Sequence, residues 1–253
     1  MIQDADFPIR LKDRLTVIFR TFGLGAVVMR GVMEQIIVTR PDDEFAVGRS
    51  KVRAHILNAW LREEGLMEEI TPYEKRLLQQ KEGTWEPDDR VEISWRVESV
   101  GVLLWALNKA ANIPAYDRLF NTDSLFDALP ILSYMEGFLR DSQLRPINEI
   151  RQAREAAEVW HWRARAYDLM RAGVSRIENQ SLTEQVKALA EVALEAGVIG
   201  EIIGDDFPAF GKTYRDLSEE EHQRAFSIAQ QRHLALNWLC GYGQAWETTP
   251  TNT

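Results

Sequence analysis

The chain has 253 residues, 45% hydrophobic and 27% charged, which is enough for a core in one large domain or two small ones. Its 15 glycines and 9 prolines exclude a collagenous or low-complexity chain. Its single cysteine excludes a disulfide framework, a thiolate zinc site and an iron–sulfur cluster. The net charge of −9 has the wrong sign for a protein that mainly binds nucleic-acid phosphates. We therefore expect a globular protein that does not bind nucleic acid.

The first 45 residues combine a helical pattern with an ambiguous one. Apolar residues recur at helical spacing from Met29 to Ile37, which predicts a helix. The apolar residues between Leu15 and Phe22 fit a strand as well as a helix, so this part could contain a short strand pair. The acidic start MIQDADFPIRLKD is not typical of a secretory signal, and charged residues interrupt the run from Leu15 to Val38. We therefore expect a cytoplasmic protein without a membrane span.

Helical signals dominate the next hundred residues. The apolar residues from Val47 to Leu61 predict a helix that stops at Gly65. Thr71 and Glu74 form a capping box, with a helix expected to Gln80. The most apolar run of the chain follows the loop at 82–89, and it predicts a buried central helix over about residues 94–112.

The remaining pattern is also helical. Residues 114–140 predict loops and short helices, and residues 146–171 keep one apolar face by steps of three and four. Ser181 with Glu184 and Ser218 with Glu221 predict the starts of two further helices, which should run to Gly197 and to about Cys240. The sequence thus predicts a single compact all-α domain over residues 46–253, with residues 1–45 as a more peripheral segment.

Known catalytic motifs are incomplete. The G-x-G at Gly23 and Gly25 lacks the third glycine of a dinucleotide-binding loop, because position 28 is Val28. No G-x-S-x-G nucleophile elbow occurs, and Cys240 follows an apolar run that predicts a buried, inert thiol. Nucleophilic catalysis has no support, and we expect no cofactor.

Two E-x-x-H spacings raise the question of a metal site. Glu158 with His161, and Glu219 with His222, each place a carboxylate and an imidazole on one helical face. A di-metal bundle also needs a glutamate from each of two other helices, for which Glu98 is the best candidate. Glu219, however, belongs to an acidic run that favours a helix N-terminus anyway. The sequence therefore predicts no metal, with this set as a minor alternative.

Charged residues on apolar helix faces are the more informative signal. Arg96 and Arg232 lie where apolar residues are expected, and a buried arginine needs a carboxylate partner. One interpretation, which the sequence favours, is a structural salt-bridge network. The other is an anion pocket lined by arginine and histidine with tryptophan walls. The candidates for that pocket are Trp95, Arg96, Glu98, Trp105, Trp162, Arg163, Arg232, His233, Asn237 and Trp238.

Three runs carry a family resemblance. They are SWRVESVGVLLWALN from Ser94, EVWHWRARA from Glu158, and GKTYRDLSEEEHQRAFSIAQQRHLALNWLCG from Gly211. Together they resemble a bacterial family known as a domain of unknown function, DUF4272, from about Arg49 to the C-terminus. The segment to about Asp43 lies outside this resemblance. The family has Glu where this chain has Gln231, and His222 is not part of the pattern.

The resemblance implies no activity, but it marks residues. By position it points to Trp95, Arg96, Glu98, Trp105, Trp160, Trp162, Arg163, Arg165, Arg232, His233, Asn237 and Trp238. Two functions stay open from the sequence. The first is a non-enzymatic interaction module, of an immunity or regulatory type, whose acidic surface engages another protein, for instance a basic one. The second is an enzyme or small-anion binder that uses the arginine, histidine and tryptophan cluster.

Overall fold

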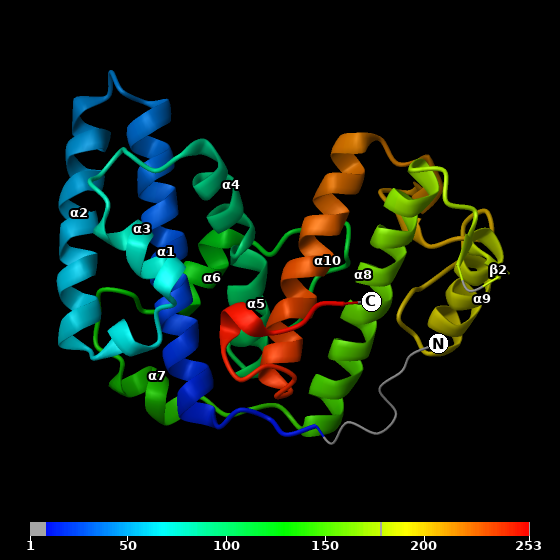
Figure 1. Cartoon of the computed structure of the whole chain (residues 1–253). Coiled ribbons are helices and arrows are strands. Elements are labelled where there is room, and N and C mark those ends of the chain that lie inside the picture. The colour runs from blue at the N-terminus through cyan, green and yellow to red at the C-terminus, as the bar shows by residue number, and fades with distance from the viewer. Residues whose placement is uncertain (1–8, 178, 253) are drawn as a thin grey trace.

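The computed structural model describes residues 9–177 and 179–252, and these residues form an all-α domain (Figure 1). The prediction of an all-α fold is confirmed. Within the described residues, β structure is limited to two short antiparallel pairs and an isolated bridge. The pairs join β1 (Arg176–Ile177) to β2 (Gln180–Ser181), and β3 (Pro208–Ala209) to β4 (Lys212–Thr213).

The N-terminal part is a helical hairpin of α1 (Arg14–Thr39) and α2 (Glu44–Glu63). Asp13 begins α1 by accepting the backbone N–H groups of Leu15 and Thr16. The expected strand pair is wrong for the described residues, because the ambiguous segment is the first half of α1. Apart from Phe19, every residue at 17–28 is buried. A helix enclosed on all sides loses the one-faced pattern that would have identified it.

Helix α1 is long and apolar enough to cross a membrane, but a buried core helix can have the same length and hydropathy. It packs against α2, α4 and α5 inside the protein, and two-thirds of its most apolar window is buried there. Its G-x-G serves this packing. A Cβ on Gly25 would lie 2.4 Å from Cδ2 of Leu129, so glycine allows the segment after α6 to approach the helix.

The predicted central helix is present but shorter than expected. It is divided into α4 (Pro87–Trp95) and α5 (Val97–Ala106), which meet at Arg96. All ten residues of α5 are buried. The helix ends before residue 112 because Asn108 adopts a left-handed conformation with φ 58°. Shorter elements between α2 and α4 are η1 (Leu66–Glu68) and α3 (Pro72–Gln79).

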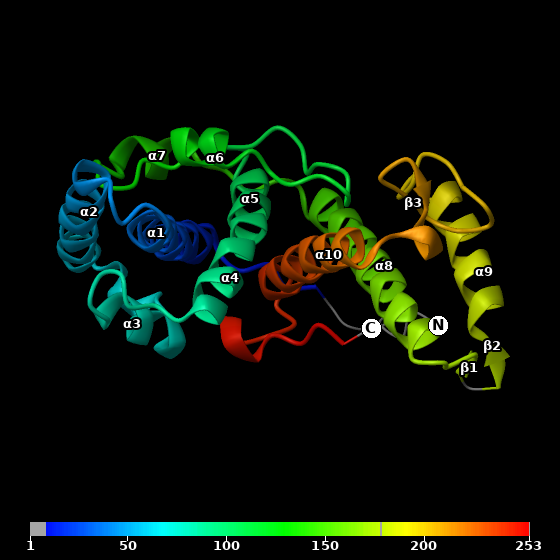
Figure 2. The same cartoon turned by 90° about the horizontal axis from the view of Figure 1, so that it is seen from above.

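The C-terminal part places α10 between α5 and α8 (Figure 2). The expected helices over 146–171 and after Ser181 and Ser218 are present. In chain order the remaining helices are α6 (Thr122–Ala128), α7 (Glu136–Asp141), α8 (Ile147–Arg171), α9 (Leu182–Glu195), η2 (Tyr214–Asp216), α10 (Glu219–Leu239) and η3 (Trp246–Thr248).

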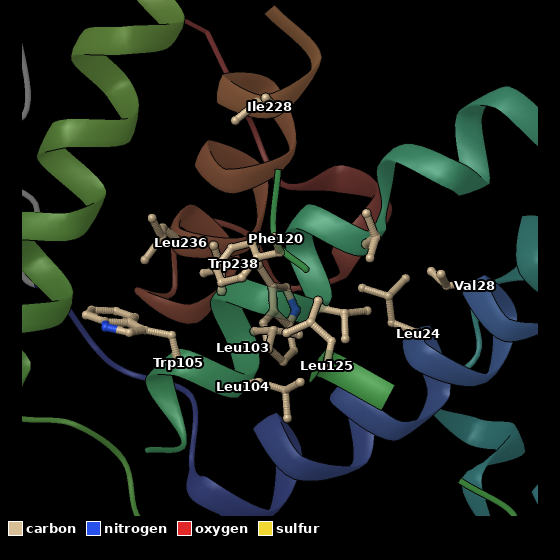
Figure 3. Packing of buried hydrophobic residues seen from close by; sticks show 14 of the residues in the cluster. Leu24, Val28, Leu103, Leu104, Trp105, Phe120, Leu125, Ile228, Leu236 and Trp238 are labelled. Atoms are coloured by element: carbon tan, nitrogen blue, oxygen red, sulfur yellow. The ribbon is translucent and has the colours of Figure 1, made fainter. Parts of the chain in front are cut away.

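One main hydrophobic core joins the two parts. It extends from α1 through α5 and α10 to Trp246 near the C-terminus. Leu103 and Leu104 of α5 lie on the side of α1, whereas Trp105 points toward α8 (Figure 3). A small second cluster of Ala166, Leu182 and Val186 attaches α9 to α8. Helix α5 therefore connects the two parts, because it packs against both α1 and α10.

Candidate functional site

The residues predicted to form an anion pocket lie on four helices and do not converge on one cavity. They fall at the end of α4 and its junction with α5, on α5, on α8 and on α10, and most are buried. The structure divides them among separate polar groups. Each group has partners that the sequence did not identify, and each holds a different part of the chain in place.

The first group is the ion pair of Arg232 and Glu98. Nε and an Nη of Arg232 lie 2.8 and 2.7 Å from Oε2 of Glu98, and both side chains are fully buried. The guanidinium also lies 4.9 Å from the ring centre of Tyr116. An anion bound by Arg232 would have to displace an internal carboxylate, which is unfavourable in a dry interior.

This ion pair positions the loop between α5 and α6. Arg232 donates to the carbonyl oxygens of Pro114, at 2.6 Å, and Arg118, at 2.7 Å. Glu98 accepts the backbone N–H of Phe120 at 2.9 Å. Buried backbone groups need hydrogen-bond partners, and here two charged side chains supply them. The pair therefore fixes the course of a loop that has no regular structure of its own.

The second group is the bidentate pair of Arg163 and Asp206. Nε and Nη2 of Arg163 lie 2.6 and 2.7 Å from the two carboxylate oxygens. Asp206 also accepts the backbone N–H groups of Phe207 and Arg215, which fixes the segment before α10. Sequence analysis missed Asp206. The available signal was weak, because the loop at 200–211 also contains the acids Glu201 and Asp205, and only the apolar residues from Phe207 onward set Asp206 apart.

The third group is centred on Glu74, which binds two arginines. Its oxygens lie 2.7 Å from Arg20 and 2.6 Å from Arg96. Burial would raise the pKa of Glu74, but the two guanidinium groups outweigh it and lower the pKa to about 2. Arg20 also stacks 4.4 Å from the ring centre of Trp246, which attaches the C-terminal segment to α1. Sequence analysis assigned Glu74 only to a capping box, which the structure confirms.

The fourth group is a row of side chains between α8 and α10. Nε of Arg154 donates to Oδ1 of Asn237, whose amide lies 2.9 Å from Nε2 of His233. Nδ1 of His233 lies 3.1 Å from Nδ1 of His161. Because the Asn237 amide donates to Nε2, His233 carries its proton on Nδ1 and donates it to His161. Nε2 of His233 thus accepts a hydrogen bond and Nδ1 carries a proton, so neither nitrogen has a free lone pair.

Both of these histidines are neutral. Burial lowers the pKa of His161 to about 4, and burial together with His161 lowers the pKa of His233 to about 3. Burial also raises the pKa of the Cys240 thiol to about 12, in agreement with the expected inert cysteine.

The residues of the E-x-x-H spacings are engaged separately. Glu158 lies 2.8 Å from Arg154, and His222 lies 2.7 Å from Asp168 and stacks on Tyr167. Glu219 accepts from Gln223 at the exposed start of α10. Within residues 9–177 and 179–252, no group of three metal-ligating side chains comes together. The described part of the chain therefore offers no support for the di-metal alternative.

The aromatic candidates have different surroundings. Trp238 packs against Trp246, with ring centres 5.4 Å apart, and Trp162 packs on the α8–α9 cluster. Trp105 is the one predicted site residue in the wall of a groove of about 1230 Å³. The groove lies between the start of α8, the end of α9 and residues 112–116. Arg151 of α8 also lines it.

Comparison with known sequences gives one match. Residues 6–192 match the family described as a domain of unknown function (DUF4272). The chain belongs to this family. The match begins at residue 6, so the N-terminal segment lies within the family region, contrary to the expectation from sequence. It ends before α10, so the third of the quoted runs lies outside the matched range. No curated protein and no solved structure matches the chain.

Proposed function

We propose that this protein is a non-enzymatic protein-interaction module of the cytoplasm. The observation that carries the proposal is the pairing of the predicted site arginines. Arg96, Arg163 and Arg232 each bind a carboxylate inside the protein. A site that binds or transforms an anion needs cationic groups aimed at the ligand, and these three are aimed at Glu74, Asp206 and Glu98.

The state of the histidines gives further support. General acid–base catalysis works best with a pKa near the working pH and with access to the substrate. His161 and His233 are buried, their pKa values lie far below neutrality, and they bind each other. The cytoplasmic assignment rests on the free Cys240 and on the burial of α1 by protein rather than by lipid.

Native mass spectrometry tests the proposal. The full chain, tagged and purified at low salt from the cells that make it, should carry a stoichiometric protein-sized added mass. Because charged partners should contribute to association, this complex should dissociate as the salt concentration rises. A protein that is monomeric and without bound partner under these conditions would overturn the proposal.

A second candidate, a small-ligand binder, is favoured by the groove beside α8. Its wall includes the aromatic side chains of Trp105 and Tyr116, the cation of Arg151 and the carboxylates of Glu149 and Glu155, a combination suited to a flat polar ligand. In the same experiment, an added mass of a few hundred daltons or less would favour this function. That mass should then be lost in an Arg151→Gln variant and kept in an Arg165→Gln variant, which changes an exposed arginine further along α8.

A further inference from the structure

The outward face of α2 carries exposed apolar side chains together with basic ones. Phe45, Val52 and Ile56 are 78%, 60% and 48% exposed. Spacings of seven and four residues place them on one face of the helix, over about 16 Å at 1.5 Å per residue. Exposed apolar residues are ordinary when scattered, but a continuous stripe on one helix is typical of an interaction surface.

Basic side chains border this stripe on both sides. At 100° per residue, Arg49 and Arg53 lie along one edge of the stripe, and Lys51, His55 and Arg62 lie along the other. From residue 45 to residue 62 there is no Asp or Glu, although the whole chain has a net charge of −9. We call Phe45, Arg49, Lys51, Val52, Ile56 and Arg62 the α2 face.

Within the described part of the protein, no carboxylate forms an ion pair with Arg49, Lys51, Arg53 or Arg62, although the buried arginines of the core are paired. Arg62 donates to the carbonyl oxygen of Asn58 on its own helix. Helix α2 lies at the edge of the molecule, with α1 between it and α5 (Figures 1 and 2). The face is therefore open along its whole length.

We infer that the α2 face binds an acidic amphipathic helix of a partner protein. The partner's apolar side chains would cover the stripe, and its carboxylates would lie against the basic borders, as in helix-in-groove recognition. Acidic residues at both ends of α2, in Asp42–Glu44 and in Glu63 and Glu64, argue against a flat anionic membrane, which would meet all of them at once. This inference rests on the proposed function and names its surface. It makes the partner acidic, whereas the net charge of −9 alone suggested a basic one, because the α2 face carries the opposite charge to the chain as a whole.

Selection from a peptide library provides the first test. The probe is a displayed library of amphipathic helices whose positions beside the apolar stripe are varied among Glu, Gln and Lys, and the target is the full chain. Binders should be enriched in Glu at these positions. Their affinity should fall at least about tenfold for Val52→Gln/Ile56→Gln and for Arg49→Glu/Lys51→Glu. A Tyr134→Gln variant, which removes an aromatic side chain that is 88% exposed elsewhere, should bind as the wild type does.

The opposite results overturn the inference. These are an absence of binders, enrichment in Lys, or binders that do not respond to the α2 substitutions. Loss of a dimer, or of binding to phosphatidylserine vesicles, in the α2 variants but not in Tyr134→Gln would assign the face to a second copy or to lipid instead. All substituted side chains are exposed, and unchanged circular dichroism confirms folding.

The two proposals can fail separately. The salt-sensitive complex should be purified with the Val52→Gln/Ile56→Gln variant as well as with the wild type. If the complex survives the substitution, the interaction function stands, but the α2 face is not its binding surface. A wild-type protein that forms no complex removes the interaction function itself.

Discussion

His161 and His233 face each other across the α8–α10 interface, with their Nδ1 atoms 3.1 Å apart. One ring must donate and the other accept, so the accepting Nδ1 of His161 must carry no proton, and His233, whose Nε2 accepts from the Asn237 amide, is also neutral. A proton added to His161 would place two donors against each other in a buried site. The most extensive helix contact of the protein therefore depends on the protonation of two side chains.

The first prediction concerns the pH dependence of stability. The pKa values of about 4 for His161 and about 3 for His233 lie below the unfolded value near 6.5, so below pH 6.5 the unfolded chain binds more protons. The free energy of unfolding should fall by about 2 to 5 kcal/mol between pH 7 and pH 4.5. Glu74, whose pKa is about 2, should extend the loss below pH 4.5.

Urea unfolding at a series of pH values measures this effect. A His161→Phe variant should be less stable at pH 7 and should show a flatter pH dependence. His55→Gln, which changes an exposed histidine on α2, should follow the wild type. Equal pH dependence in all three proteins would contradict a role for the buried pair.

The second prediction concerns the two arginines bound to Glu74. A Glu74→Gln substitution removes the charge that separates Arg20 from Arg96, so two cations remain buried together. The free energy of unfolding should fall by about 3 to 5 kcal/mol. Glu92→Gln is the matched control, because Glu92 binds the same Arg96 but is half exposed. This control should lower the free energy of unfolding by less than about 1 kcal/mol, measured by guanidinium unfolding. Equal losses in the two variants would show that Glu74 acts only as a helix cap.

The third prediction concerns the pair of Arg232 and Glu98. Arg232→Met and Glu98→Leu each leave a buried charge without its partner, whereas the double variant leaves none. The double variant should therefore lose less stability than the sum of the single variants, by about 0.5 to 3 kcal/mol. Amide exchange of Phe120 should become faster in both single variants, since its N–H binds Glu98. If the losses of stability are additive and the amide exchange of Phe120 is unchanged, the ion pair does not hold the loop in place.

The fourth prediction compares two helical glycines. A Gly25→Ala substitution adds a Cβ that collides with Leu129, so we expect a loss of about 1 to 3 kcal/mol despite the better helix propensity of alanine. A Cβ on Gly48 of α2 meets no atom within 4 Å. Gly48→Ala should therefore stabilise the protein by about 0.5 to 1 kcal/mol. Thermal unfolding measures both changes, and a stable Gly25→Ala protein would mean that Leu129 moves aside.

The sequence by itself determined the all-α class and the starts of most helices. These depend on local chemistry, such as the cap formed by Ser218 and Glu221 and the apolar spacing of α8. The sequence also predicted charged side chains on buried helix faces, at Arg96 and Arg232. Local signals were insufficient for α1, because a helix buried on all sides has no polar face to define its period.

Only the tertiary structure decided which carboxylates Arg163 and Arg232 bind, whereas the buried Arg30 and Arg154 pair with Glu34 and Glu158 on their own helices. Asp206 lies 43 residues from Arg163, and Glu98 lies 134 residues from Arg232. Such pairs form because the fold brings distant elements together, and burial then makes an unpaired charge too unfavourable to remain. The same holds for the free face of α2. Its apolar and basic residues are visible in the sequence, but their exposure depends on the other helices, which pack against the opposite side of the helix.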